Sequence, residues 1–250
     1  MKNKQVLYPL LGIAVIASGV AVFFAGVYFT KTVSQTTTES DVVADFETVD
    51  SHDHLYVDEY FKSLPKEELS QEEIDGLLLM REEEKLAHDV YITLYEKWGQ
   101  NIFSNISKSE QTHTDMVASL LIKYDIEDPV KTNDVGVFQN TDFSKLYTEL
   151  VEQGEQSLID ALTVGATVED LDIKDLQTLM EQSDNQDIVT VYQNLTKGSR
   201  NHLRAFTRML NRNGALYEAQ YITESEYQEI IDTPSENGVF YDAKGKGRNW

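Results

Sequence analysis

The sequence predicts an all-α fold, an antiparallel four-helix bundle with one long crossover connection, preceded by an N-terminal transmembrane helix. Three observations support this prediction. Pro129 is the only proline between Lys66 and Asp232, and proline is excluded from helix interiors, so long helices fit on both sides of it. Apolar residues recur in these blocks at alternating steps of three and four, which is the pattern of helices with one buried face. An uninterrupted apolar run lies near the N-terminus.

The apolar run from Leu10 to Phe29 lies in a segment, residues 5–30, that carries no charged residue. A helix of about 20 such residues spans a hydrocarbon core of about 30 Å. Lys2 and Lys4 precede the run, so the positive-inside rule predicts a single-pass membrane protein with a cytoplasmic N-terminus and an extracytoplasmic bundle. A cleaved signal peptide is the alternative, although such peptides have a shorter apolar region and a small-residue cleavage site. We therefore expect residues 1–31 to be an anchor in contact with the membrane, or a signal peptide.

The rest of the chain divides by composition into three parts. Residues 32–59 are rich in Ser, Thr and acidic residues and predict a flexible acidic tether. Residues 60–232 carry the helical pattern, and residues 233–250 predict a disordered C-terminal tail. The net charge of −22 argues against a nucleic-acid partner. The chain has no cysteine, which excludes disulfides and thiolate metal sites, so any metal site must use carboxylates and histidines.

Capping signals and turns give the expected helices. Ser70 and Glu73 form a capping-box pattern, and the expected long helices cover residues 71–98, 102–124, 156–182 and 186–213, with short helices at 142–153 and 224–231. The first and second long helices are separated by a short turn, as are the third and fourth, so each pair is antiparallel. The connection between the pairs is long enough to run back along a whole helix. One such crossover is the ferritin-like arrangement of a four-helix bundle.

Polar residues interrupt the core-facing stripe near the middle of each long helix. Burying an unpaired charge costs several kcal/mol, so an interruption on four helices requires an explanation. Glu110 and His113 are three residues apart and point to one side of their helix. Carboxylates that bridge two cations, with an imidazole on each, would account for the pattern. The alternatives are exposed positions on misphased helices or a buried hydrogen-bond network. We interpret the following residues as metal ligands: Glu84, Glu110, His113, Glu169, Asp172 and His202.

Neighbouring polar residues receive simpler interpretations. Glu82, Glu83 and Lys85 are expected on a solvated face or beside the ligands, and His88 on the surface. Tyr91 is expected as a packed core tyrosine or as a residue beside the ligands, and no catalytic residue is assigned.

The motifs around these residues resemble a known family. Glu84-x-x-Ala87-x-x-x-Tyr91, together with Glu110-x-x-His113, is similar to the first half of a rubrerythrin or ferritin di-iron bundle. The wider sequence resembles an uncharacterised ferritin-like family, the domain of unknown function 2202, over residues 64–231. The resemblance rests on these stretches: Met80–Ala87, Trp98-Gly99, Gly136–Phe138, Gly165-Ala166, Asp172-Ile173-x-Asp175-Leu176, Gly198-Ser199-x-Asn201–Phe206 and Gln220–Ile222.

The resemblance implies ligand roles position by position. Glu84 matches the first-helix ligand, Glu110 and His113 those of the second, Glu169 with Asp172 the third-helix carboxylates, and His202 the fourth-helix histidine. Ser199 departs from the pattern, which has Glu three residues before that histidine.

Two classes of function remain open. The first is a metal protein, with iron preferred and manganese or zinc as alternatives, that reduces O₂ or peroxide or oxidises Fe(II). Because cysteine is absent, it would need an external electron donor. The second is a non-enzymatic metal-binding or protein-interaction module with a degenerate site. Self-association into a homo-oligomer also stays open.

Overall fold

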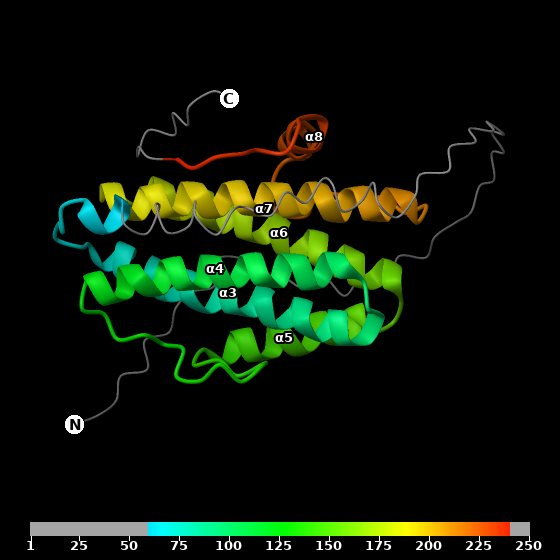
Figure 1. Ribbon diagram of the computed structural model, residues 1–250, viewed down its shortest axis with the longest axis horizontal. Coiled ribbons are helices and arrows are strands. Elements are labelled where there is room, and N and C mark those ends of the chain that lie inside the picture. Colours follow the sequence, from blue (N-terminus) through cyan, green and yellow to red (C-terminus); the bar gives the residue numbers. More distant parts are fainter. Residues whose placement is uncertain (1–59, 241–250) are drawn as a thin grey trace. The chain divides into compact units, whose positions relative to one another are not determined.

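The computed structural model describes residues 60–240, and this part of the chain is all-helical (Figure 1). A helical turn at residues 60–63 comes first. The bounds of the four long helices lie within two residues of those predicted from capping and periodicity. In chain order the helices are α3 (Gln71–Trp98), α4 (Asn101–Lys123), α5 (Thr141–Gly154), α6 (Leu158–Glu181), α7 (Gln186–Arg212) and α8 (Glu224–Asp232).

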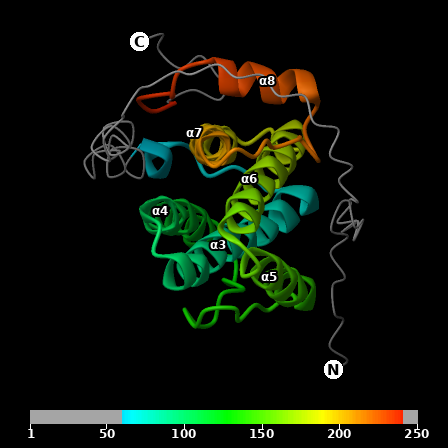
Figure 2. The ribbon, with the colours of Figure 1, turned by 90° about the vertical axis from the view of Figure 1, so that its right-hand side faces the viewer.

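The four long helices form two antiparallel hairpins. α3 packs along α4, and α6 packs along α7, while α3 also contacts α6 and α4 contacts α7 (Figure 2). The connection from α4 to α6 contains α5, which lies against α3 and α6. This arrangement brings the middle of all four long helices together in one buried layer.

Local chemistry determines where the helices begin and end. The Ser70 side chain accepts the backbone N–H of Glu73, and the Glu73 carboxylate accepts that of Ser70. Gly99 ends α3 in the left-handed region at φ 64°, which permits the abrupt turn into α4. Ser157 caps α6 by accepting the backbone N–H of Asp160. The ends of these helices are therefore set by contacts between capping side chains and nearby backbone groups.

The core has three layers along the bundle. One end is apolar, and its fully buried side chains include Leu77, Leu120, Leu176, Val191 and Leu195. The middle layer is polar. The other end is aromatic and includes Tyr91, Phe103 and Phe206, with the Tyr91 and Phe206 ring centroids 5.3 Å apart. A Cβ at Gly165 would lie 2.4 Å from the Phe206 ring, so the absence of a side chain at Gly165 leaves room for this ring.

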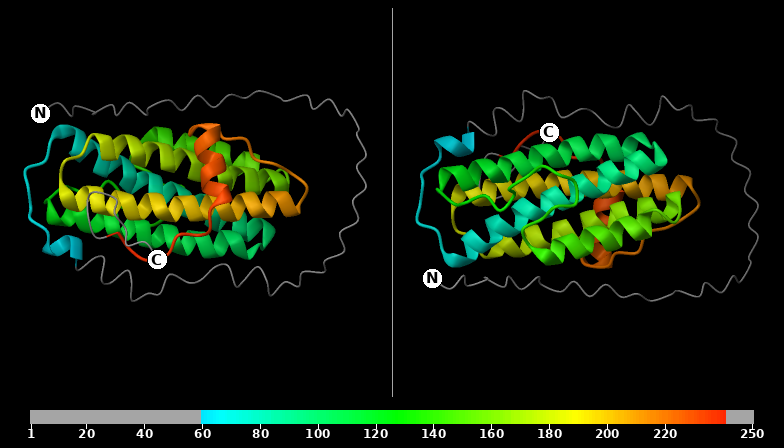
Figure 3. Two further views of the ribbon diagram at one scale, coloured as in Figure 1. Left: turned by 90° about the horizontal axis from the view of Figure 1, so that it is seen from above. Right: turned by 90° about the horizontal axis from the view of Figure 1, so that it is seen from below.

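The segment that follows α7 is held against the bundle mainly by one carboxylate, with a further hydrogen bond from Gln220 to Oγ1 of Thr167. Asp170 accepts the Tyr217 hydroxyl at 2.7 Å and the backbone N–H groups of Gln220, Tyr221 and Ile222 at 2.6 to 3.2 Å. We call residues 217–222 the strap. α8 then crosses α7 (Figure 3).

The described part of the C-terminal tail, residues 233–240, differs from the expected disorder. The Asn194 side chain pairs with the backbone of Phe240, and Glu236 forms ion pairs with Arg200 and Arg204. These contacts hold residues 233–240 along α7. The helical periodicity of the sequence does not predict them. Residues 241–250 lie outside the described part of the chain.

The prediction of a membrane-spanning helix requires a correction. Among residues 60–240, no helix combines the length and apolar character needed to cross a bilayer. The predicted fold class is therefore corrected to an all-helical fold, and the described helices lend no support to the predicted single-pass membrane localisation. The apolar run at Leu10–Phe29 and the expected tether at 32–59 lie outside the described residues.

Candidate metal centre

Five of the six predicted ligands meet in the buried middle layer. α3 supplies Glu84, α4 supplies Glu110 and His113, α6 supplies Glu169, and α7 supplies His202, and none is more than 5% exposed. They form two clusters that share Glu110. One holds Glu84, Glu110 and His113, and the other holds Glu110, Glu169 and His202. Within each cluster one ligand atom per residue lies within 4.8 Å of the others, so these buried groups could hold metal ions.

Glu110 lies between the two histidines. Its Oε2 is 2.8 Å from Nδ1 of His113, and its Oε1 is 2.8 Å from Nδ1 of His202. Nδ1 of His113 is also 3.2 Å from Oε2 of Glu84, and Nδ1 of His202 is 3.3 Å from Oε2 of Glu169. Each oxygen of Glu110 therefore faces a separate imidazole and carboxylate, which is the arrangement of a bridging ligand with one terminal pair on each side.

Several donor atoms of the clusters lack a hydrogen-bond partner among the described residues. These atoms are Oε1 of Glu84, Oε1 of Glu110 and Nδ1 of His202. The last two are 2.8 Å apart and form an ion pair when His202 is protonated. Buried polar atoms are nearly always paired, so donor atoms that converge in this way could bind an ion. Carboxylate oxygens and imidazole nitrogens suit iron, manganese and zinc. The residues therefore fit a metal ion in each cluster.

The protonation of the metal-free clusters follows from burial and proximity. Burial raises the pKa of Glu84 to about 8 and that of Glu169 to about 7; Glu110 adds to both shifts, while the neighbouring histidine opposes each. Burial would also raise the pKa of Glu110, but His202 and His113 outweigh it and hold that pKa well below its usual range. Burial lowers the pKa of His202, but Glu110 and Glu169 reverse this and raise it to about 10. Without metal, an anionic Glu110 thus lies between protonated imidazoles.

Two further contacts orient the ligands. The buried Tyr91 hydroxyl donates a hydrogen bond to Oε1 of Glu169, which fits the expectation of a tyrosine beside the ligands. Nε2 of His202 lies 3.1 Å from Oγ of Ser109. Such outer contacts fix the orientation of ligands around a metal.

Gly198 is a site residue that the sequence reasoning missed. A Cβ at this position of α7 would lie 2.4 Å from Cε1 and 2.5 Å from Nε2 of His113. The absence of a side chain therefore makes room for the imidazole. The available signal was a glycine inside a helical pattern, which often marks close packing.

Asp172, the sixth predicted ligand, lies outside both clusters. It accepts a hydrogen bond from Ser199, which in turn is 2.9 Å from the carbonyl oxygen of Leu195. Ser199 occupies the position where the motif expects a fourth-helix Glu. The serine hydroxyl is thus paired with Asp172 and does not contribute a carboxylate to the centre.

Glu82, Glu83 and Lys85 do not lie on a solvated face, because each is only 4% exposed. The connection before α5 covers this side of α3. The Glu82 carboxylate accepts the backbone N–H groups of Gln139 and Asn140, and the Lys85 ammonium pairs with Asp89 and the carbonyl oxygen of Asp134. Both oxygens of Glu83 lack a hydrogen bond within the described residues.

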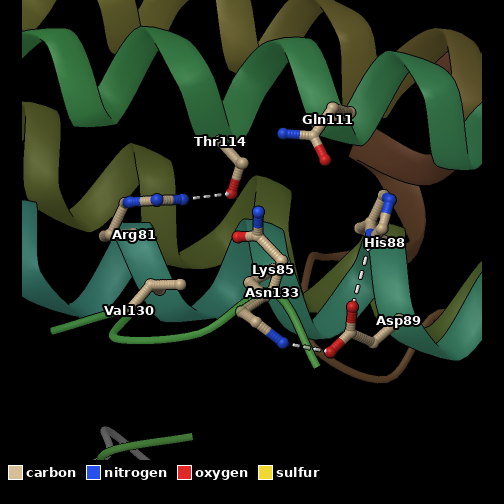
Figure 4. A pocket seen from close by; sticks show the side chains of 8 residues that line it. All are labelled: Arg81, Lys85, His88, Asp89, Gln111, Thr114, Val130 and Asn133. Carbon is tan, nitrogen blue, oxygen red and sulfur yellow. Dashed lines mark hydrogen bonds and ion pairs between the residues drawn. The ribbon is translucent and has the colours of Figure 1, made fainter. Parts of the chain in front are cut away.

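A small polar pocket of about 70 Å³ is lined by residues of α3, of α4 and of the connection that follows α4 (Figure 4). Its lining includes Thr114, the residue after His113, and the Thr114 hydroxyl accepts a hydrogen bond from Nη1 of Arg81 at 3.1 Å. Nδ1 of His88 pairs with Asp89 at 2.9 Å, and neither cluster includes His88; its side chain is 19% exposed, so it is half-buried and does not lie on the surface as expected. The pocket is lined by Arg81, Lys85, His88, Asp89, Gln111, Thr114, Val130 and Asn133.

Comparison with known proteins identifies the family. The match to the uncharacterized protein domain DUF2202 covers residues 73–234. The chain belongs to this family. It is also 59% identical over 181 residues to the uncharacterized protein MJ0754 of Methanocaldococcus jannaschii, a match that covers 72% of this chain and 98% of the relative. The crystal structure of hypothetical protein MJ0754 from Methanococcus jannaschii aligns with a TM-score of 0.69, over 70% of this chain and 99% of that one. This DUF2202 member thus shares its fold with a solved relative.

Proposed function

We propose that this DUF2202 protein binds two divalent metal ions, iron or manganese, bridged by Glu110. The observation that carries the proposal is the position of Glu110, with each oxygen 2.8 Å from a different histidine. Glu84 and His113 would complete one ion's protein ligands, and Glu169 and His202 those of the other. The set resembles that of ferritin-like di-iron bundles, which use a Glu from two helices and Glu-x-x-His from the other two.

We propose further that the centre supports oxidation of Fe(II) or reduction of O₂ or peroxide. A redox-active metal at such ligands supplies the change of oxidation state. The chain itself would supply three things. The buried carboxylates would neutralise the positive charge of the ions, the bundle would limit solvent around them, and the Tyr91 hydroxyl donates a hydrogen bond to Oε1 of Glu169. Electrons would come from outside the chain, which has no cysteine for an iron–thiolate relay.

One observation favours a second candidate, a centre that binds metal without turnover. Ser199 replaces a carboxylate that the di-iron pattern contains, and its hydroxyl is engaged with Asp172. The centre would then have one shared carboxylate, that of Glu110, where the di-iron pattern has two, and this loss of negative charge weakens stabilisation of a higher oxidation state.

Metal content distinguishes these functions from an empty hydrogen-bond network. Full-length protein is reconstituted with Fe(II) under anaerobic conditions and analysed for iron per chain. We expect two ions in the wild type and a loss in His113→Ala and His202→Ala, whereas the matched control His88→Ala keeps both. A wild type that retains no iron above the chelated sample contradicts the proposal. Oxygen consumption on adding Fe(II) then separates the redox centre from the binding-only centre.

A further inference from the structure

Two asparagines on the outer side of α7 hold residues 236–240 by their backbone. Oδ1 of Asn201 accepts the backbone N–H of Glu236, and Nδ2 of Asn201 donates to the Glu236 carbonyl oxygen, both at 2.9 Å. Asn194 forms the same pair of hydrogen bonds with the backbone of Phe240, both at 3.0 Å. A side-chain amide that pairs with both backbone groups of one residue does not contact the side chain of that residue. These contacts therefore recognise an extended chain, whatever its sequence.

The spacing of these contacts matches that of an extended segment. Asn194, Lys197 and Asn201 follow one another at steps of three and four, so they share one side of α7. The Lys197 ammonium donates to the carbonyl oxygen of Gly238, between the two asparagine contacts. Seven helical residues span about 10.5 Å, and four residues of extended chain span at most about 14 Å. The segment runs antiparallel to α7 (Figure 1).

Two side chains of the segment are also bound. The Glu236 carboxylate accepts hydrogen bonds from Nε of Arg200 at 2.7 Å and from Nη2 of Arg204 at 3.1 Å. Val239, three residues later, is 8% exposed and packs with the apolar core cluster. Paired arginines prefer a carboxylate, so this side of α7 selects an acidic residue followed three positions later by an aliphatic one.

We propose that this side of α7 is a binding site for an extended peptide segment of a partner protein, and that residues 236–240 occupy it as an internal ligand. We call the site the clamp, and it consists of these residues: Asn194, Lys197, Arg200, Asn201 and Arg204. Backbone hydrogen bonds that give affinity, with side-chain contacts that give specificity, are typical of extended-peptide recognition.

The internal ligand is suited to displacement. Among residues 233–240 only Val239 is buried, and segments with few buried apolar contacts open at a low cost in free energy. A ligand on the same chain nevertheless has a high effective concentration. A partner segment therefore competes well only when the internal contacts are weakened.

The test uses a full-length chain whose internal ligand is weakened by the double variant Glu236→Ala and Val239→Ala. A fluorescent peptide with the sequence of residues 233–240, blocked at both ends, is titrated in the presence of chelator and followed by its anisotropy. We expect the double variant to bind the peptide at least about tenfold more tightly than the wild type, because the site is no longer filled. A peptide with alanine in place of its glutamate should bind about tenfold more weakly, since it lacks the charge-assisted hydrogen bonds.

Further changes in the double variant locate the site. Arg200→Gln and Asn194→Ala should each weaken peptide binding about tenfold, whereas the matched control Arg212→Gln, at an exposed position of α7, should leave it unchanged. The proposal is overturned if the double variant, with its helical circular dichroism retained, shows no saturable binding at millimolar peptide. Binding that neither Arg200→Gln nor Asn194→Ala weakens overturns it as well. Because the measurement is made without metal, its outcome does not depend on the proposed metal centre.

Discussion

The apolar end and the polar middle of the bundle are built from the same four helices but contribute oppositely to stability. At the apolar end, residues such as Leu77, Leu120 and Leu176 are fully buried, and each contributes about 1.5–3 kcal/mol through burial. In the middle, Glu84, Glu110 and their partners are equally buried, but their desolvation costs several kcal/mol per ion before pairing offsets it. The difference teaches that stability and candidate function occupy separate layers.

The largest expected effect comes from removing apolar volume where stability resides. Leu120→Ala should lower the free energy of unfolding by about 2–5 kcal/mol, because it leaves a cavity in a fully buried layer. Metal content per folded chain should stay the same, since Leu120 lies outside both clusters. Urea denaturation of the metal-free protein measures the first quantity, and metal analysis of the folded fraction measures the second.

The control for this comparison is Ile122→Ala on the same helix. Ile122 is 77% exposed, so its truncation should change stability by no more than about 0.5 kcal/mol. A loss of metal in folded Leu120→Ala would show that the two layers are coupled and would break the comparison.

The next effect is the pH dependence of the metal-free protein. The folded pKa values of Glu84 and Glu169, about 8 and about 7, lie above the ordinary 4.5. The folded state therefore holds protons that the unfolded state has released. The contribution of these two protonated carboxyl groups to the free energy of unfolding is complete below pH 4.5. It is lost as the pH rises to about 8. The slope should reach about 1.4 kcal/mol per pH unit for each proton held.

Urea denaturation with chelator at pH 5, 6, 7 and 8 measures this slope. Glu110 acts in the opposite direction, since its pKa is lowered and its contribution is lost only at more acidic pH. The double variant Glu84→Gln and Glu169→Gln should make the profile shallower but not flat, because the raised pKa of His202 acts in the same direction at higher pH. Added metal should reverse it, because ligands release protons when metal binds. A metal-free stability that rises from pH 5 to 8 would contradict the assigned protonation.

The smallest expected change in stability, with a large change in binding, comes from Gly198→Ala. The new Cβ would collide with the His113 imidazole at 2.4 Å, and such overpacking costs about 1–3 kcal/mol. Alanine also has a higher helix propensity than glycine, which offsets about 1 kcal/mol of this cost. The net loss in the free energy of unfolding should therefore be about 1 kcal/mol. Displacement of His113 should nevertheless reduce metal content.

Gly76→Ala provides the matched control for this variant. Its Cβ would meet Cδ2 of Leu179 at 2.8 Å in the apolar end, where the end of a leucine side chain can move aside. Metal content should equal that of the wild type. If Gly198→Ala binds as much metal as the wild type, metal binding does not depend on the observed position of the His113 imidazole.

The helices and the proposed ligands were predictable from sequence for physical reasons. Capping residues such as Ser70 act locally, and ligands three or four residues apart share a face whatever the tertiary structure. The burial of Glu83 and Lys85 was not predictable, because periodicity marks one face of α3 while the α4–α5 connection and α6 cover others. Gly198 shows the same limit, since its importance depends on an imidazole from another helix. Asp172 has the right spacing, but its partner Ser199 is determined only by how α6 and α7 pack.

The way in which the strap is attached predicts a local motion that the packed helices do not share. One carboxylate, Asp170, accepts most of the strap's hydrogen bonds to the bundle, from Tyr217, Gln220, Tyr221 and Ile222, and Gln220 also donates to Oγ1 of Thr167. Breaking these few contacts requires far less free energy than melting four packed helices, so the strap can open as a local unit while the bundle stays folded. Amide hydrogen exchange in residues 220–222 should then be faster than in α6 beneath it. Exchange of solvent around Tyr221 would follow this local opening and not global unfolding.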